Sequence, residues 1–241
     1  DIYGGSGDLM LYGICGSDDG WVKIDGEGMT VDAGKLTYDA VVISKCQNLI
    51  FENVRVRGGL DACIAVDSAS KNIRIANCDI AEWGLGSVFD NKSGLYMRSG
   101  TTFNYSAGII ACASENLVVE RCYIHDSDTK TNPWIGTGYM DVHPAGSCGV
   151  YMMGKRGTVI RYNDFVGSDE HRFNDVLEGA GNGGRGDTST GSDSDIYGNM
   201  LIFSNDDIME LDSGQMNVRV YHNRMEQAHV GISGAPNTMG P

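Results

Sequence analysis

The chain has 241 residues, which is enough for one large domain with a sizeable core. Its 32 acidic and 18 basic side chains give a formal net charge of −14, so the basic face that a nucleic-acid-binding protein needs is missing and no nucleic-acid partner is expected. No apolar run approaches the roughly 18 residues of a membrane-spanning helix, so no membrane partner is expected either. The 34 glycines favour many tight turns over a helical bundle.

The elements predicted along the chain repeat one unit. Six segments alternate as β-strands do, and each opens and closes on an apolar residue: 51–56, 75–80, 119–124, 160–165, 196–201 and 220–225. Their fourth residues are Val54, Cys78, Cys122, Asn163, Asn199 and Asn223, at spacings of 24, 44, 41, 36 and 24 residues. A second short strand is predicted within each repeat, at 63–66, 108–111, 149–152, 176–178, 208–211 and 231–233.

This pattern resembles the right-handed parallel β-helix of the pectate-lyase-like superfamily over about residues 40–233. The resemblance implies an all-β solenoid of about seven coils, with Asn and Cys side chains stacked inside, and a secreted protein in an extracellular or periplasmic location. Right-handed crossovers are also what parallel strands favour. We expect one domain, residues 1–241, in which 1–39 start the solenoid and 40–233 form regular coils.

Three intervals are longer than the bare repeat and are predicted to be flanking loops: 85–105, 127–145 and 179–194. Residues 234–241 contain no recognisable cap for the last coil. Because open strand edges must be covered, we expect either a further capping segment or end-to-end self-association there. The seven cysteines show no zinc-type spacing, and Cys78 and Cys122 are predicted to be neighbouring free thiols in the core.

Acidic residues gather at matched positions of two neighbouring coils. Residues that directly follow the inward-facing position of each second strand should point outward, and they are Ala65, Ile110, Tyr151, Glu178, Glu210 and Ser233. Because neighbouring coils lie about 4.8 Å apart, we expect Glu178 beside Glu210 and Asp175 beside Asp207, with Asp206 adjacent. Carboxylates that close repel each other, and the pKa of one member of each pair should rise.

A protonated carboxyl group can donate a proton to a leaving oxygen while an ionised partner attacks or activates water. We therefore predict a polysaccharide-active glycoside hydrolase with its carboxylates in an open cleft. Glu178 and Glu210 are the predicted acid and partner, and Asp175, Asp206 and Asp207 tune or share these roles. Carboxyl separations of about 5–5.5 Å (retaining) and roughly 6.5–9.5 Å (inverting) both remain open.

Asp206 and Asp207 also resemble the paired aspartates of polygalacturonases. That family's Gly-His-Gly and Arg-Ile-Lys signatures are missing from this sequence, which argues against that particular activity. Five residues near the acids are predicted to bind the substrate through ring stacking or positive charge: Tyr151, His171, Arg172, Arg185 and His229.

Two other functions remain open. The first is a polysaccharide lyase acting on uronate-containing glycans, with calcium held by Asp175, Asp206, Asp207 and Glu210, and with Lys155, Arg156 or Arg185 supplying the basic chemistry. The second is a non-catalytic solenoid, such as an adhesin, a fibre subunit or a glycan-binding module. Hydrolysis requires no cofactor, and in every case the expected partner is a polysaccharide or oligosaccharide.

Overall fold

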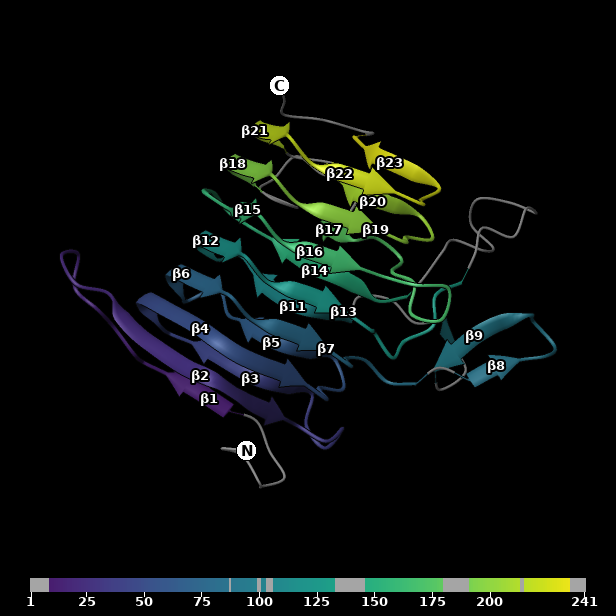
Figure 1. Cartoon of the computed structure of the whole chain (residues 1–241), viewed down its shortest axis with the longest axis horizontal. Helices are drawn as coiled ribbons and strands as arrows, with labels where there is room; N and C mark the ends of the chain where they lie inside the picture. The colour runs from purple at the N-terminus through teal and green to yellow at the C-terminus, as the bar shows by residue number, and fades with distance from the viewer. Residues whose placement is uncertain are drawn as a thin grey trace.

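Parallel β-strands form nearly all of the regular structure of the chain (Figure 1). A computed structural model describes residues 9–86, 88–98, 101–102, 106–132, 146–179, 191–212 and 215–234. Within these residues every element is a strand, and none is a helix long and apolar enough to cross a membrane. The all-β parallel β-helix predicted from the repeat is confirmed.

One face of the solenoid is an eight-stranded parallel sheet, here called sheet A. Its strands, in spatial order, are β1 (Leu9–Tyr12), β3 (Asp39–Ser44), β5 (Ala62–Val66), β11 (Ala107–Cys112), β14 (Cys148–Met153), β17 (Leu177–Gly179), β20 (Asp207–Glu210) and β23 (Val230–Ser233). Each strand pairs with the equivalent strand of the next coil, so the sheet runs the length of the solenoid (Figure 1).

A twelve-stranded sheet supplies the other two faces, because its long first strands, β2 (Val22–Asp32) and β4 (Gln47–Arg57), span both. One face continues through β6 (Lys71–Ala76), β12 (Glu115–Glu120), β15 (Val159–Arg161), β18 (Ser192–Tyr197) and β21 (Met216–Tyr221). The other continues through β7 (Asp79–Ala81), β13 (Tyr123–His125), β16 (Asp164–Val166), β19 (Met200–Ile202) and β22 (Arg224–Glu226).

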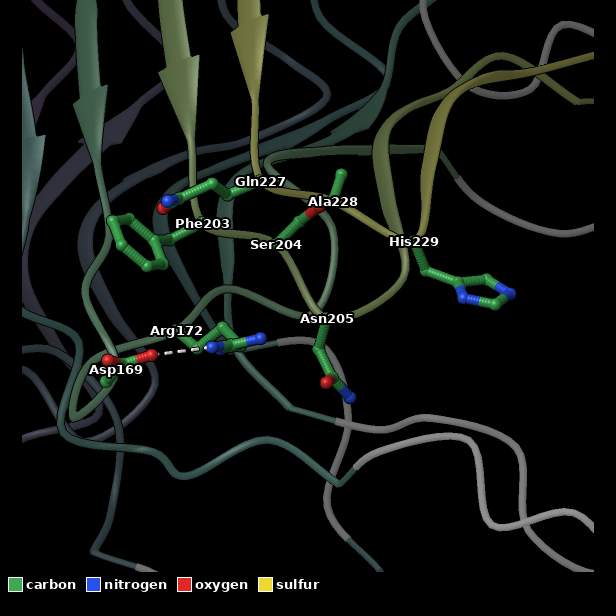
Figure 2. A pocket seen from close by; sticks show the side chains of 8 residues that line it. All are labelled: Asp169, Arg172, Phe203, Ser204, Asn205, Gln227, Ala228 and His229. Atoms are coloured by element: carbon green, nitrogen blue, oxygen red, sulfur yellow. Dashed lines mark hydrogen bonds and ion pairs between the residues drawn. The ribbon is translucent and has the colours of Figure 1, made fainter.

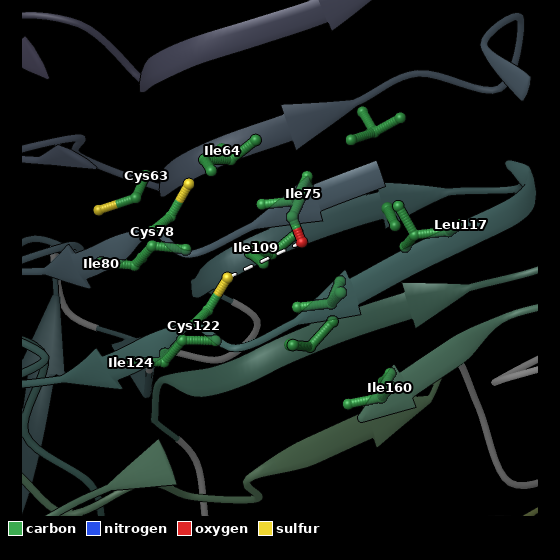
Figure 3. Close-up of a cluster of buried hydrophobic side chains, with 14 of the residues drawn as sticks. Cys63, Ile64, Ile75, Cys78, Ile80, Ile109, Leu117, Cys122, Ile124 and Ile160 are labelled. Carbon is green, nitrogen blue, oxygen red and sulfur yellow. Dashed lines mark hydrogen bonds between the residues drawn. The ribbon is translucent and has the colours of Figure 1, made fainter. Parts of the chain in front are cut away.

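The register between coils matches the alignment of the six repeat segments. Their opening residues pair in the order Phe51, Ile75, Val119, Ile160, Ile196 and Val220, and their closing residues Val56, Ile80, Ile124, Phe165, Leu201 and Met225 do the same. The apolar members of these columns fill the core, where burial of side chains such as Ile75 and Leu117 stabilises the coil (Figure 3).

The predicted Asn and Cys stack lies inside the solenoid, at the bend between the two faces of the larger sheet. Cys78 and Cys122 are buried free thiols that lie close together (Figure 3). In the following coils the side-chain oxygen of Asn199 accepts hydrogen bonds of 3.0 Å from both the backbone N–H and the amide of Asn163, and Asn223 repeats this towards Asn199. This ladder satisfies backbone groups that a bend would otherwise leave unpaired.

The first insertion differs from the predicted loop. Its described residues form an antiparallel sheet of β8 (Val88–Asp90), β9 (Leu95–Arg98) and β10 (Thr101–Thr102), which projects from one side of the solenoid (Figure 1). The tight turn at 91–94 pairs β8 with β9 locally, and no coil-to-coil repeat predicts that pairing. Most of the other two insertions, residues 133–145 and 180–190, lie outside the described part of the chain.

Interior positions become more exposed at the last described coil. Ile232 of β23 is 44% exposed, although the equivalent Ile64 and Val150 of earlier coils are fully buried. Val230 is 37% exposed, although Asp207, its partner in the preceding coil, is only 8% exposed. A capping segment or end-to-end self-association would cover this surface, and both remain predictions.

The Asn ladder gives a stability prediction. Asn199→Ala should lower the free energy of unfolding by about 2–4 kcal/mol, because it leaves buried groups of Asn163 and the Ile160 carbonyl without partners. Urea unfolding followed by circular dichroism measures the change. The control is Asn91→Ala in the exposed turn of the β8–β9 hairpin, where less than about 0.5 kcal/mol is expected. Equal losses in the two variants would contradict the assigned role of the ladder.

Candidate functional site

The acidic residues lie at the outer side of sheet A, on and just before β17 and β20. The pairing register places Leu177 beside Met209, Tyr151 beside Glu178 and Glu210 beside Ser233, as the alignment predicts. Just before these strands the chain bends, and the Val176 carbonyl accepts hydrogen bonds of 3.0 Å from the backbone N–H groups of both Gly149 and Val150.

Direct contacts join the acids into one group, here called the acid cluster: Asp175, Glu178, Asp206, Asp207 and Glu210. The Asp207 backbone N–H donates to Asp175 Oδ1 at 2.8 Å, and the Asn174 side-chain amide donates to Asp175 Oδ2. Glu178 is hydrogen-bonded to both Asp175 and Glu210. The structure therefore brings together the residues that the alignment placed on neighbouring coils.

Burial of the acid cluster corrects one expectation. Asp175, Glu178, Asp206 and Asp207 are only 2%, 5%, 7% and 8% exposed, whereas an open cleft would leave them in water. They pack against one another and against buried neighbours such as Cys148 and Asn174, which a count of residues along a strand does not reveal. Glu210 is the partly exposed member, so it is the carboxyl group of the cluster that is most open to a ligand.

Burial also governs the ionisation of these groups. Loss of hydration, and after it the nearby carboxyls of Asp206 and Asp175, raise the pKa of Asp207 to about 8. Desolvation likewise raises the pKa of Asp175 to about 6 and that of Glu178 well above its ordinary value. It also raises the pKa of the Cys148 thiol, whose sulfur lies 4.0 Å from Glu178 Oε2. Several members of the cluster are thus protonated near neutral pH.

The Glu178–Glu210 hydrogen bond bears on the predicted carboxyl separations. Two carboxyl groups in hydrogen-bond contact are closer than either the retaining or the inverting arrangement requires. The two glutamates therefore do not stand on opposite sides of a glycosidic bond, and any second catalytic carboxyl has to come from elsewhere in the acid cluster.

A cavity of about 620 Å³ lies at the turns that lead into β20 and β23 (Figure 2). It is lined by Asp169, Arg172, Phe203, Ser204, Asn205, Gln227, Ala228 and His229. Asn205 directly precedes the acid cluster, and the His229 backbone N–H donates to the Asp206 carbonyl at 3.2 Å. The cavity is therefore adjacent to the cluster.

Arg172 supplies the positive charge of this cavity. Its guanidinium lies 2.8 Å from Asp169 Oδ1 and 5.8 Å from the centre of the Phe203 ring. Figure 2 shows Arg172 below Phe203, with the His229 ring extending away from them. Mixed donors, acceptors and an aromatic ring are the groups that bind sugars through hydroxyl contacts and stacking.

Two of the other predicted substrate-binding residues, Tyr151 and His171, are not among those that line the cavity. Tyr151 is partly buried and stands beside Glu178 in sheet A. His171 is committed to the scaffold, because its Nδ1 lies 2.8 Å from the Ser127 carbonyl, and it is not among the residues that line the cavity. Arg185 lies outside the described residues.

Several residues of the site were not predicted from the sequence. Phe203 and Gln227 occupy equivalent turn positions, each directly after a strand of the β19–β22 face, because Ile202 pairs with Glu226. Aligning the residues that follow each closing apolar position would have found this column. Asn174 and Cys148, which border the acids, stand in the alignment columns of Asp206 and Asp207, but their contacts with the acids were not predicted because these depend on burial.

The acid cluster offers ligands for a cation. Oxygen atoms of Asp175, Asp206 and Asp207 lie within 4.8 Å of one another, and a second group joins Cys148, Asp175 and Glu178. Carboxylate oxygens suit calcium, which binds them at about 2.3–2.6 Å, whereas the Cys148 thiol does not. Three of the four predicted calcium ligands thus lie together, and calcium binding itself remains a prediction.

Comparison with known proteins gives weak matches only. No family model matches, and no curated protein matches by sequence. Three solved structures align with 95–98% of the chain. They are the A-module of a mannuronan C-5 epimerase from Azotobacter vinelandii (13% identity, TM-score 0.47), the catalytic domain of an α-1,3-glucanase in complex with tetrasaccharides (11%, 0.33) and a surface adhesin of Streptococcus pneumoniae (10%, 0.26).

The chain spans 57% of the epimerase module, 62% of the glucanase domain and 72% of the adhesin structure. At these identities and TM-scores the matches do not assign an activity to this chain.

The raised pKa values predict a pH dependence of stability. Between about pH 4 and pH 8 the folded state keeps a proton on Asp207 that the unfolded chain has lost, so this group's contribution to stability falls as the pH rises through that window. Its slope should reach about 1.4 kcal/mol per pH unit. Asp207→Asn should flatten the slope, as measured by urea unfolding from pH 4.5 to 8. A variant with an unchanged slope would show that Asp207 ionises normally.

Proposed function

We propose that the protein is a secreted enzyme that cleaves a polysaccharide by hydrolysis of glycosidic bonds. The observation that carries the proposal is the acid cluster itself. Buried carboxyl groups that hold protons pack around the partly exposed Glu210, and the cluster adjoins a polar cavity with a cationic and an aromatic side chain. Proton donation and water activation at neighbouring carboxyls are the two steps that glycoside hydrolysis needs.

The geometry favours particular roles within the cluster. Asp207 is the proton donor, because its raised pKa keeps it protonated near neutral pH. Its proton passes to the glycosidic oxygen as the bond from that oxygen to the anomeric carbon breaks. Water adds to that carbon and gives its proton to Glu210. Glu178 is a positioning residue, since it is buried and holds Glu210 through a hydrogen bond.

The cavity supplies the binding site for the glycan chain. Arg172 and His229 offer donors, Phe203 offers a ring face, and Asn205 joins the cavity to the acid cluster. Tyr151 extends the same surface one coil further along sheet A. Arg185 and the insertions at 133–145 and 180–190 lie outside the described residues.

The first test is an assay on plant, algal and microbial polysaccharides with calcium present. Each reaction is followed for new reducing ends and for the ultraviolet absorbance of unsaturated uronates. We expect reducing ends without absorbance. Asp207→Asn and Glu210→Gln should each lower the rate by about 10²–10⁴-fold.

Glu226→Gln is the matched control, because Glu226 is an exposed acid on another face and pairs with Arg224. Its activity should equal that of the unmodified protein. Full activity in Glu210→Gln would overturn the assigned roles. Binding to a polysaccharide without any product would leave a non-catalytic glycan-binding module.

A calcium-dependent lyase is the second candidate, and the spacing of Asp175, Asp206 and Asp207 favours it. In that case the cation would neutralise a uronate carboxylate beside these acids. Hydrolysis predicts that a chelator such as EDTA leaves the rate within about twofold of the untreated enzyme. Loss of activity with EDTA, its return with calcium and a rise in ultraviolet absorbance would instead establish the lyase.

A further inference from the structure

A second hollow lies on another face of the solenoid, on strands β4, β7 and β13. Outward-facing Arg57, Ala81 and His125 stand in one register row, so the small Ala81 is flanked by two long side chains. The result is a cavity of about 220 Å³ above Ala81, whose rim also includes Arg55, Asp79 and Glu82. None of these residues lines the cavity beside the acid cluster.

The walls of this hollow are held in place by contacts within the protein. His125 lies between two carboxylates, with Nε2 3.0 Å from Asp79 and Nδ1 2.9 Å from Asp126. Its ring also stacks on Tyr123, with centroids 3.9 Å apart. Opposite it, Arg57 lies 3.6 Å from Asp32 and 3.7 Å from Glu82. Walls fixed in this way lose little freedom when a ligand binds.

A second cavity continues the hollow across the same face. It has a volume of about 360 Å³ and is lined by Glu27, Gly28, Asn53, Val54, Arg55, Asn77 and Asp79. Arg55 and Asp79 belong to both cavities and face each other in register. The two cavities therefore adjoin at this pair and are here together called the groove; their volumes of about 220 and 360 Å³ together fall within the roughly 300–1,000 Å³ of small-ligand sites.

The chemistry of the groove suits an uncharged sugar. The lining offers donors from Arg55, Arg57 and Asn77 and acceptors from Asp79 and Glu82, and sugar hydroxyl groups both donate and accept hydrogen bonds. Arginine and carboxylate charges nearly cancel along the lining. For a uronate, attraction by Arg55 and Arg57 would be offset by repulsion from Asp79 and Glu82, so the net charge of −14 disfavours it relative to a neutral sugar.

We propose that this groove is a second, non-catalytic binding site for a neutral oligosaccharide. One sugar ring occupies the hollow above Ala81, and the chain continues past Arg55 towards Asn53 and Asn77. The site shares no residue with the acid cluster or its cavity. Binding here therefore does not require that the acid cluster be catalytic.

The test is isothermal titration calorimetry of the full chain carrying Glu210→Gln, which prevents consumption of the ligand. The probes are cellohexaose, maltohexaose, laminarihexaose and the anionic hexagalacturonate. We expect at least one neutral hexasaccharide to bind more tightly than hexagalacturonate. Ala81→Leu fills the hollow, and Asp79→Asn removes a charged acceptor, so each should weaken binding by about tenfold or more.

The matched control is Asp164→Asn, because Asp164 continues the outward row of Arg55, Asp79 and Tyr123 beyond the groove. Binding to this variant should stay within about twofold of the parent. The proposal is overturned if no neutral hexasaccharide binds, or if Asp79→Asn binds as well as Asp164→Asn. Asp79→Asn keeps the test decisive even if Ala81→Leu fails to fold.

Discussion

Parallel pairing between successive coils places equivalent residues about 4.8 Å apart, and nearly every property of this protein depends on that constraint. Inside the solenoid the constraint is favourable, because it stacks apolar rows and lets Asn163, Asn199 and Asn223 satisfy one another and the backbone. On the outer faces it also brings residues at equivalent positions into contact, even where both carry the same charge. A repeat that places an acid in two neighbouring coils therefore places two acids side by side.

The acid cluster is the place where this constraint opposes stability. Five carboxyl groups meet on and just before β17 and β20, and four of them are largely shielded from water. The raised pKa values of Asp175, Glu178 and Asp207 reflect the free energy that burial of their charges would cost. Protonation keeps several of these groups uncharged. The buried Glu120 is stabilised differently, because it is paired with Arg74 and Arg161 and its pKa is lowered. A group of buried acids with raised pKa values beside a cavity is the pattern that functional sites show.

The sequence predicted the coil register to the residue, because apolar spacing alone fixes which positions face inward. The same alignment placed Glu178 beside Glu210 and Asp175 beside Asp207, and the structure has these neighbours. It did not predict burial of the acids or the column of Phe203 and Gln227, because both depend on side-chain packing at the turns beside the strands, which apolar spacing does not encode. The β8–β9 hairpin escaped prediction for a similar reason, since its pairing is local and outside the repeat.

The groove on β4, β7 and β13 shows how a repeat can produce a binding surface without any exception to its register. A row that reads Arg57, Ala81 and His125 becomes hollow only because one coil contributes a methyl group where its neighbours contribute long side chains. No single residue in that row has an unusual identity, so no motif marks it in the sequence. In a solenoid, side-chain size along a row shapes the surface much as side-chain charge along a row shapes the acid cluster. Two faces of one scaffold can therefore acquire separate ligand chemistry by substitution at a few outward positions, while the inward rows that hold the coils together stay unchanged.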